Sequence, residues 1–192
     1  MDGSESEMST RARKFGKRLF GRYGVECEMF DERGTTREAK AIARAAGYAH
    51  VALGPQIADV GTAPVDLAGG ASWFKGESLG KWVDSGLVIL SDYPIIRTRK
   101  MAFPADMCAG FDCLAAKGVL LAWIKVPGHD TPVAIADTHL NSRKASGVDV
   151  NRANTAYGLQ VAAARQFIRA NVPADAGIIF GGDFNLGHDP RR

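Results

Sequence analysis

Several features common in other protein classes are scarce in this 192-residue chain. Its only cysteines are Cys27, Cys108 and Cys113, and none forms a CxxC pair. This pattern argues against a disulfide scaffold and against a structural zinc site. No apolar run approaches the roughly 18 residues that a membrane-spanning helix needs, and the first ten residues are polar, unlike a secretory signal. We therefore expect a reduced, cytoplasmic protein without a transmembrane segment.

A large excess of positive or negative charge is also absent over the chain as a whole, since the formal net charge is only +3. The exception is the stretch RARKFGKRLFGR, which begins at Arg11 and follows an acidic start. We expect residues 1–24 to form a disordered, basic arm ahead of a single domain at residues 25–192. The arm is either a surface that touches phosphates or anionic lipid, or a solvated charge run.

Helix and strand signals alternate after Val25. A capping box at Thr35–Glu38 predicts a helix that ends at Gly47, and residues 54–81 predict a long irregular region. Pro94 is expected to stop the strand before it. The predicted strands are 48–53, 85–91, 119–126, 133–140 and 177–180, and the second predicted helix is 153–170. A hairpin between nearly apolar strands favours α/β architecture with two stacked sheets flanked by helices.

The most informative short motif is Gly181-Gly182-Asp183-Phe184-Asn185, where an apolar strand ends. The glycines allow a ligand or a neighbouring strand to approach closely. Asp183 can orient a water, while the Asn185 amide can contact phosphate or ligate a hard cation. The alternative is an ordinary strand-to-turn junction, because Asp and Asn are common in turns.

Three further residues are candidates for phosphate chemistry. His139 ends the apolar run VAIADTHL, where it could transfer protons or bind phosphate; the alternative is a structural histidine. Glu28 could bind Mg²⁺ or simply face solvent. Lys117 precedes another apolar strand and is a phosphate contact or a plain strand-start lysine.

The order of these segments resembles the endonuclease/exonuclease/phosphatase superfamily, which has the DNase I-like fold. CEMFD, SGLVILSDYPI, THLNS and GGDFN are similar to the family's motifs in the same order, over about residues 25–187. CLAAKG followed by THLNS is closest to the bacterial sphingomyelinase-like branch. The resemblance implies a four-layer α/β/β/α sandwich of DNase I-like type, incomplete here.

The resemblance also implies roles for individual residues. Glu28 and Asn185 would bind Mg²⁺ or Mn²⁺, His139 would contact phosphate and protonate the leaving group, and Asp183 would activate water. Lys117, Asn141 and Arg97 are candidates for phosphate or substrate contacts. The implied activity is metal-dependent hydrolysis of a phosphodiester in phospholipid or nucleic acid.

Two parts of the family pattern are absent from the sequence. No apolar strand with an Asn precedes Val25, and no Asp-His pair follows the last motif. A sheet that lacks these strands would expose an edge and favour self-association. The alternative function is therefore an inactive fragment or remnant that binds anions. The aromatic residues Trp73, Phe74 and Trp82 either face lipid or nucleic-acid bases or cover the core.

Overall fold

The computed structural model describes residues 41, 43–63, 65–67 and 69–186. The predicted arm 1–24, the domain boundary beside it and Glu28 lie outside these residues. All described residues belong to one compact unit, Thr35–Arg192. Its elements, in chain order, are β1 (His50–Leu53), η1 (Ile57–Asp59), η2 (Trp73–Lys75), β2 (Val88–Ser91), β3 (Ile95–Ala102), η3 (Gly110–Leu114), β4 (Gly118–Ile124), β5 (Val133–His139), α3 (Val150–Asn171) and β6 (Ile178–Asp183).

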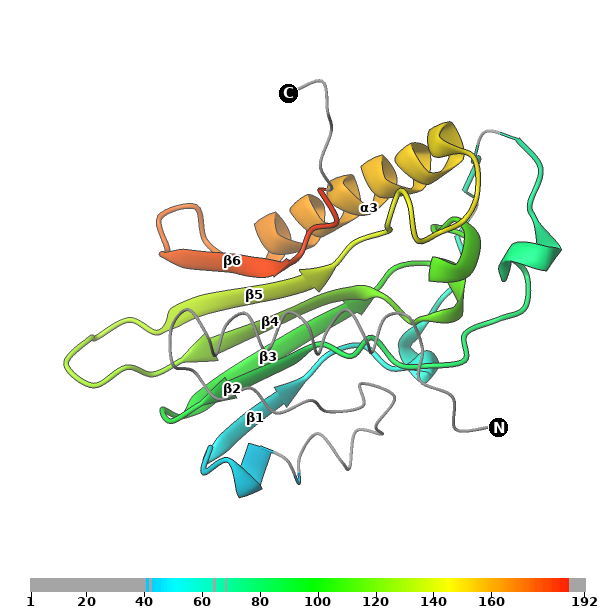
Figure 1. The fold of residues 1–192 in the computed structure, drawn as a ribbon. Coiled ribbons are helices and arrows are strands. Elements are labelled where there is room, and N and C mark those ends of the chain that lie inside the picture. Colours follow the sequence, from blue (N-terminus) through cyan, green and yellow to red (C-terminus); the bar gives the residue numbers. More distant parts are fainter. Residues whose placement is uncertain (1–40, 42, 64, 68, 187–192) are drawn as a thin grey trace, which may run out of the picture. The chain divides into compact units, whose positions relative to one another are not determined.

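Two sheets form the centre of this unit (Figure 1). β1 and β2 pair antiparallel, and the larger sheet has the order β3-β4-β5-β6. In the larger sheet, β3, β4 and β5 are antiparallel neighbours, whereas β5 and β6 run parallel. The C-terminal ends of β5 and β6 therefore lie side by side.

β4 explains why the sheets stack, because all seven of its residues are buried. Leu120, Ala122 and Ile124 pack toward β1 and β2, together with Ala52 and Ile89. On the opposite face, Leu121 and Trp123 belong to the cluster that Phe167 and Ile168 of α3 join. The described residues thus form helix, sheet and sheet layers, which confirms the predicted mixed α/β class.

Several element boundaries agree with the sequence. The helical residues before β1 end at Gly47, which has φ +87°, and Tyr48 N–H donates to Ala43 O, the geometry of a Schellman cap. The Asp149 side chain caps α3 by accepting from Asn151 N–H at 2.9 Å. The predicted hairpin is present, with Gly128 in its turn at φ +79°.

The predicted stop before Pro94 is confirmed, since β2 ends at Ser91, but the strand β3 that begins at Ile95 was not predicted. The alternation of cations with small or apolar residues hid this strand. β3 is an edge strand with five successive exposed residues, and charged side chains suit such an edge because they discourage pairing with other chains. Lys100, for example, forms an ion pair with Asp59 at 2.6 Å.

Among the strands that the structure describes, β6 forms the other edge of the larger sheet. Its apolar residues Ile178, Ile179 and Phe180 are 38%, 60% and 41% exposed. Exposed apolar side chains on an edge strand provide a surface for further strand pairing. Self-association through this edge stays a prediction.

Candidate active site

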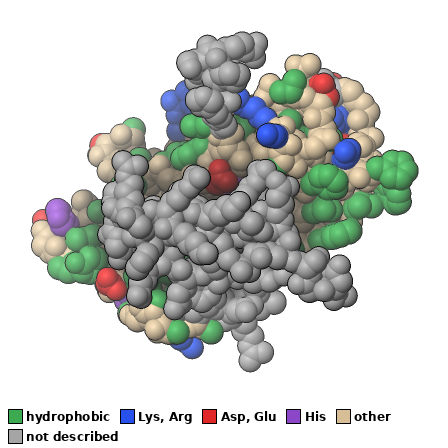
Figure 2. Space-filling view, viewed as in Figure 1, with side chains coloured by type: hydrophobic (Ala, Val, Ile, Leu, Met, Phe, Trp, Pro, Cys, Tyr) green, Lys and Arg blue, Asp and Glu red, His purple; other side chains and the backbone are tan. Residues whose placement is uncertain are grey.

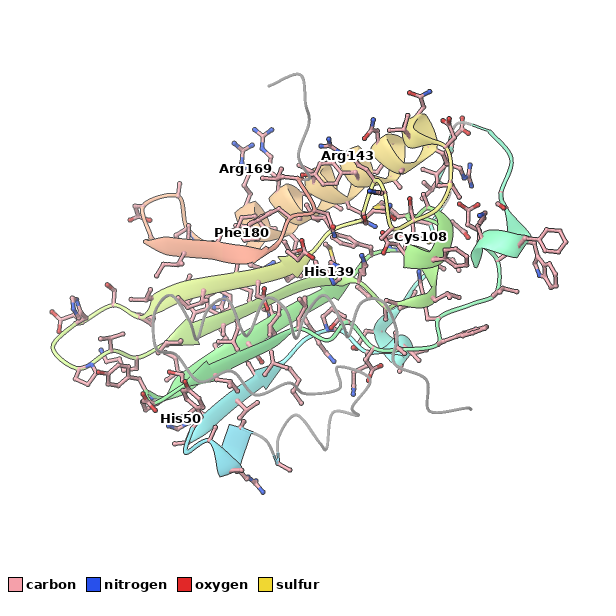
Figure 3. The ribbon with its side chains drawn as sticks, viewed as in Figure 1. His50, Cys108, His139, Arg143, Arg169 and Phe180 are labelled. Carbon is pink, nitrogen blue, oxygen red and sulfur yellow. A yellow bond between two sulfur atoms is a disulfide. The ribbon has the colours of Figure 1, made fainter. Side chains whose placement is uncertain are left out.

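The parallel pairing of β5 with β6 places two sequence-predicted residues side by side. His139 and Asp183 are register partners at the last positions of the two strands. His139 Nε2 lies 3.6 Å from Asp183 Oδ2, and both side chains are partly exposed. Figure 3 shows His139 at the end of β5. The strand ends therefore bring together an imidazole and a carboxylate that are distant in the sequence.

Lys117 joins this pair from the neighbouring strand. It directly precedes β4, whose start lies beside the end of β5 because these strands are antiparallel. The Lys117 ammonium contacts three acceptors: Asp112 Oδ1 at 2.8 Å, Leu140 O at 3.0 Å and His139 Nε2 at 3.0 Å. An ammonium has three N–H donors, so these contacts account for all of them.

The contact with Lys117 identifies the tautomer of His139. Nε2 cannot both accept from Lys117 and donate to Asp183. The Lys117 contact, at 3.0 Å, has a normal hydrogen-bond length, whereas the Asp183 contact, at 3.6 Å, does not. We therefore infer that Nε2 is an acceptor and that the neutral ring carries its proton on Nδ1.

Asp112 anchors Lys117 and was not singled out from the sequence. The short helix η3 carries it into the site, where its second oxygen, Oδ2, accepts from Ser142 N–H. Lys117 is only 5% exposed, and burial lowers its pKa, while the Asp112 carboxylate opposes that shift. A buried cation of this kind needs its carboxylate partner. Nothing in the local pattern around Asp112 distinguishes it from a surface residue.

Asn185 occupies a strained turn directly after β6. Its φ is +46°, its N–H donates to Asp183 Oδ1 at 2.9 Å, and its Nδ2 donates to Leu140 O at 2.7 Å. Non-glycine residues at positive φ cluster at functional sites. Because its amide nitrogen is engaged, the oxygen is the Asn185 atom that remains for a ligand.

Two of the predicted substrate contacts lie elsewhere. Asn141 is fully buried: its Oδ1 accepts from Ala109 N–H and its Nδ2 donates to Ser142 O, so it supports the loop beneath the site. Arg97 lies toward the far end of the sheet, over the Trp123 ring, and donates to Asn171 O. Its guanidinium stacks on an aromatic face rather than lining the phosphate site.

Of the two glycines in the motif, Gly182 is the one whose position leaves no room for a side chain. Its φ is +123°, and a Cβ added there would lie 2.0 Å from Thr138 O. At Gly181 the space around such a Cβ is empty to 4 Å. Of the two glycines, only Gly182 is required for the close approach of β6 to β5. The next register pair along these strands is His139 and Asp183.

The aromatic residues of the irregular region do not cover the core. Phe74 is 85% exposed, while Trp73 and Trp82 are 61% and 64% exposed. Figure 2 shows exposed hydrophobic side chains grouped at the right of the view. Of the two sequence alternatives for these rings, burial against the core is therefore wrong.

The described residues alone do not complete a metal centre. They contain no group of three His, Cys, Asp or Glu side chains that could hold an ion. Asp183 and the Asn185 amide oxygen nevertheless suit Mg²⁺, which often takes one or two protein carboxylates and completes its shell with water and phosphate. Glu28, the other predicted ligand, stays a prediction.

The pKa of Asp137 gives a first testable prediction. Asp137 lies two residues before His139, and burial raises its pKa to about 6 although Thr138 N–H opposes this. Ionising it thus costs more in the folded state, so stability falls as the pH rises from about 4 through 6. We expect Asp137→Asn to stabilise the protein by about 1 kcal/mol at pH 7.5 and not at pH 3.5, measured by urea unfolding. An equal gain at both values would contradict this assignment.

Comparisons with known proteins divide the chain. A family model described as RuvX, Holliday junction resolvase, matches residues 1–61. A protein from Chromohalobacter salexigens named "Putative pre-16S rRNA nuclease" is 69% identical over 48 residues, which are 25% of this chain and 32% of that protein. A protein of the same name from Mannheimia succiniciproducens is 46% identical over 79 residues, 41% of this chain and 53% of its own. The chain thus spans about a third to a half of these relatives.

The solved structures that resemble the chain are not named as nucleases or resolvases. Sphingomyelinase C from Streptomyces griseocarneus matches with a TM-score of 0.58 and 23% identity, over 89% of this chain and 56% of its own. SmcL matches with a TM-score of 0.53 and 23% identity, over 73% of this chain and 43% of its own. These likenesses show the predicted DNase I-like fold. Glu28, by contrast, lies in the segment that the RuvX model matches.

Proposed function

We propose that the described residues form the phosphate-binding part of a metal-dependent phosphodiester hydrolase. The observation that carries the proposal is the cluster of His139, Asp183 and Lys117 at the ends of adjacent strands. It combines a buried cation hydrogen-bonded to an imidazole with a partly exposed carboxylate 3.6 Å from that ring. These are the groups that phosphodiester hydrolysis requires, for charge neutralisation, proton transfer and orientation of water.

Each side chain has a definable task in this proposal. The Lys117 ammonium attracts the phosphoryl oxygens, and Asp183 orients the attacking water. Because the Lys117 contact occupies Nε2, His139 would use its Nδ1–H toward the phosphate or the leaving oxygen. A Mg²⁺ or Mn²⁺ ion held by Asp183 and Asn185 would further neutralise the phosphoryl charge.

The names of the similar proteins support the reaction class and leave two substrates open. The relatives over the first part of the chain are named for nuclease activity on pre-16S rRNA, and the fold neighbours are sphingomyelinases. RNA and sphingomyelin both contain phosphodiesters. No helix in the part of the chain that the structure describes is long and apolar enough to cross a membrane. The nuclease names favour a nucleic-acid substrate, whereas the sequence expectation named phospholipid and nucleic acid equally.

Hydrolysis of bis(p-nitrophenyl) phosphate with and without Mg²⁺ tests the reaction class. We expect turnover that EDTA abolishes and excess Mg²⁺ restores, because the Lys117 donors are already engaged and a bound cation would supply the charge neutralisation that the phosphoryl oxygens need. Turnover that persists in EDTA would contradict the metal requirement. Parallel assays with structured RNA, plasmid DNA and sphingomyelin vesicles then separate the substrates.

The competing function is an anion-binding module without turnover. It is favoured by the lack of a three-ligand group among the described residues. A folded, monodisperse sample that binds inorganic phosphate but hydrolyses none of these substrates would establish it and refute the hydrolase proposal.

A further inference from the structure

The sparse cysteines suggested a chain without disulfides, yet Cys108 and Cys113 are bonded to each other. The bond spans η3, the short helix that carries Asp112 into the candidate active site. Both cysteines are largely buried, at 5% and 6% exposure. They also line a cavity of about 270 Å³, together with Glu77, Asp106 and other residues. A small molecule can therefore reach this disulfide without unfolding of the sheets.

We propose that Cys108–Cys113 is a thiol-exchange site, whose reduction by a small thiol or dithiol releases η3 and thereby disorganises the Asp112–Lys117 pair. The exchange reaction is independent of the function proposed above. Only its consequence for hydrolysis rests on that function. Disulfides in reducing compartments are usually transient or redox-sensing, which suits the location expected from the sequence.

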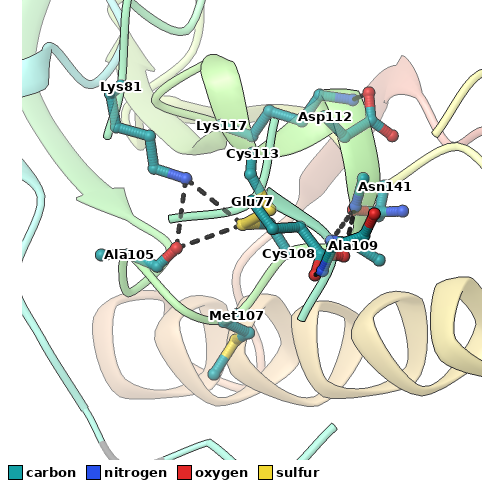
Figure 4. The surroundings of a disulfide bond; sticks show 12 residues. Glu77, Lys81, Ala105, Met107, Cys108, Ala109, Asp112, Cys113, Lys117 and Asn141 are labelled. Atoms are coloured by element: carbon teal, nitrogen blue, oxygen red, sulfur yellow. Dashed lines mark hydrogen bonds and ion pairs between the residues drawn. A yellow bond between two sulfur atoms is a disulfide. The ribbon is translucent and has the colours of Figure 1, made fainter. Parts of the chain in front are cut away.

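Lys81 gives the two sulfur atoms different roles. Its ammonium lies 3.5 Å from Cys108 Sγ and 3.4 Å from Ala105 O (Figure 4). Burial lowers the pKa of Lys81 to about 8, although the Asp106 carboxylate opposes this shift. Lys81 is therefore mainly protonated at neutral pH. A cation beside a sulfur stabilises the thiolate, which makes Cys108 the better leaving group.

The reaction can be followed atom by atom. The thiolate of the reductant attacks Cys113 Sγ, a new S–S bond forms, and the electron pair of the old bond leaves on Cys108 as a thiolate beside Lys81. The second thiol of a dithiol then attacks the mixed disulfide and releases Cys113, which takes up a proton. Two electrons pass from the dithiol, which becomes a cyclic disulfide.

Contacts of η3 connect this bond to the site. Between the two cysteines, Asp112 holds Lys117 through one oxygen and Ser142 N–H through the other. Lys117 in turn contacts His139. Opening the disulfide removes the covalent link between Cys108 and Cys113, which are five residues apart. The position of Asp112 then depends on its hydrogen bonds alone. We therefore expect the Ser142 amide to lose protection when the bond opens.

The exchange is tested on the full chain with Cys27→Ser, which removes the third thiol. Glutathione is added, the reaction is stopped with N-ethylmaleimide, and peptides are mapped by mass spectrometry. We expect the mixed disulfide on Cys113, and Lys81→Met should slow its formation roughly threefold to tenfold. The exposed Lys144→Met is the matched control and should react at the wild-type rate. An adduct on Cys108, or equal rates in the two lysine variants, would overturn the proposal.

The link to the site is tested by hydrogen exchange after reduction with dithiothreitol. The Ser142 amide should exchange faster, whereas amides of Leu120 and Leu121 in β4 should stay protected, showing that the fold persists. Unchanged protection at Ser142 would refute the coupling. Neither measurement needs turnover, so a chain that hydrolyses no phosphodiester would refute the proposed function while leaving this inference to be decided separately.

Discussion

Hydrolysis by the Asp183→Asn variant is expected to fall about a hundredfold to ten-thousandfold. The carboxylate is the group that orients water in the proposed reaction, and an amide cannot take a proton from it. Asparagine keeps an oxygen that can accept from Asn185 N–H, as Asp183 Oδ1 does at 2.9 Å. The substitution therefore tests the charge while retaining the turn.

The control for this variant is Asp175→Asn. Asp175 lies in the exposed turn before β6, at the opposite end of the strand from Asp183. This variant also removes one negative charge, but away from the candidate active site, and it should leave the rate within twofold, a margin that corresponds to about 0.4 kcal/mol. The thermal stability of both variants is measured, so that a loss of activity is not mistaken for a loss of folded protein. Equal activity of Asp183→Asn and wild type would remove Asp183 from the mechanism.

The site illustrates what strand-end motifs reveal. His139 and Asp183 were recognised because each ends an apolar run, and parallel strands bring such ends to one edge of a sheet. In the structure these two residues are register partners on β5 and β6. Lys117 was recognised in the same way, since it begins an apolar strand. Its burial could not be inferred from the sequence, because it depends on how Asp112 of η3, Leu140 O and His139 close around the ammonium.

Asp112 shows why the remainder of the site escaped detection. It belongs to η3, a five-residue helix without helical periodicity that also contains Cys113. Its contact with Ser142 N–H spans 30 residues and reaches the loop beyond β5, whereas its contact with Lys117 spans only five. Residues that act through tertiary contacts of this kind carry no local pattern.

Fold prediction succeeded where burial dominates and failed where it does not. β4 and β5 were predicted because their apolar content is high, and β4 is buried on both faces. β3 was missed because its cations suggested a loop, although it pairs with β4 over nearly its whole length. Edge strands need little apolar surface, so composition identifies them poorly.

The Gly182→Ala variant is expected to be destabilised by about 2–5 kcal/mol or to fail to fold. An alanine Cβ would lie 2.0 Å from Thr138 O and 2.7 Å from Thr138 N, and Thr138 is fully buried in β5. The backbone at φ +123° is also one that side chains rarely adopt. Strain and overpacking each cost about 1–3 kcal/mol, and neither can relax without separating β6 from β5.

Gly181→Ala provides the matched control, one residue away on the same strand. The space around its Cβ is empty to 4 Å, so its stability should change by less than about 1 kcal/mol, the cost typical of a surface substitution. Urea unfolding of both variants measures the difference. If Gly182→Ala folds as stably as Gly181→Ala, β6 does not approach β5 this closely. The register that places Asp183 beside His139, and with it the candidate active site, would then be wrong.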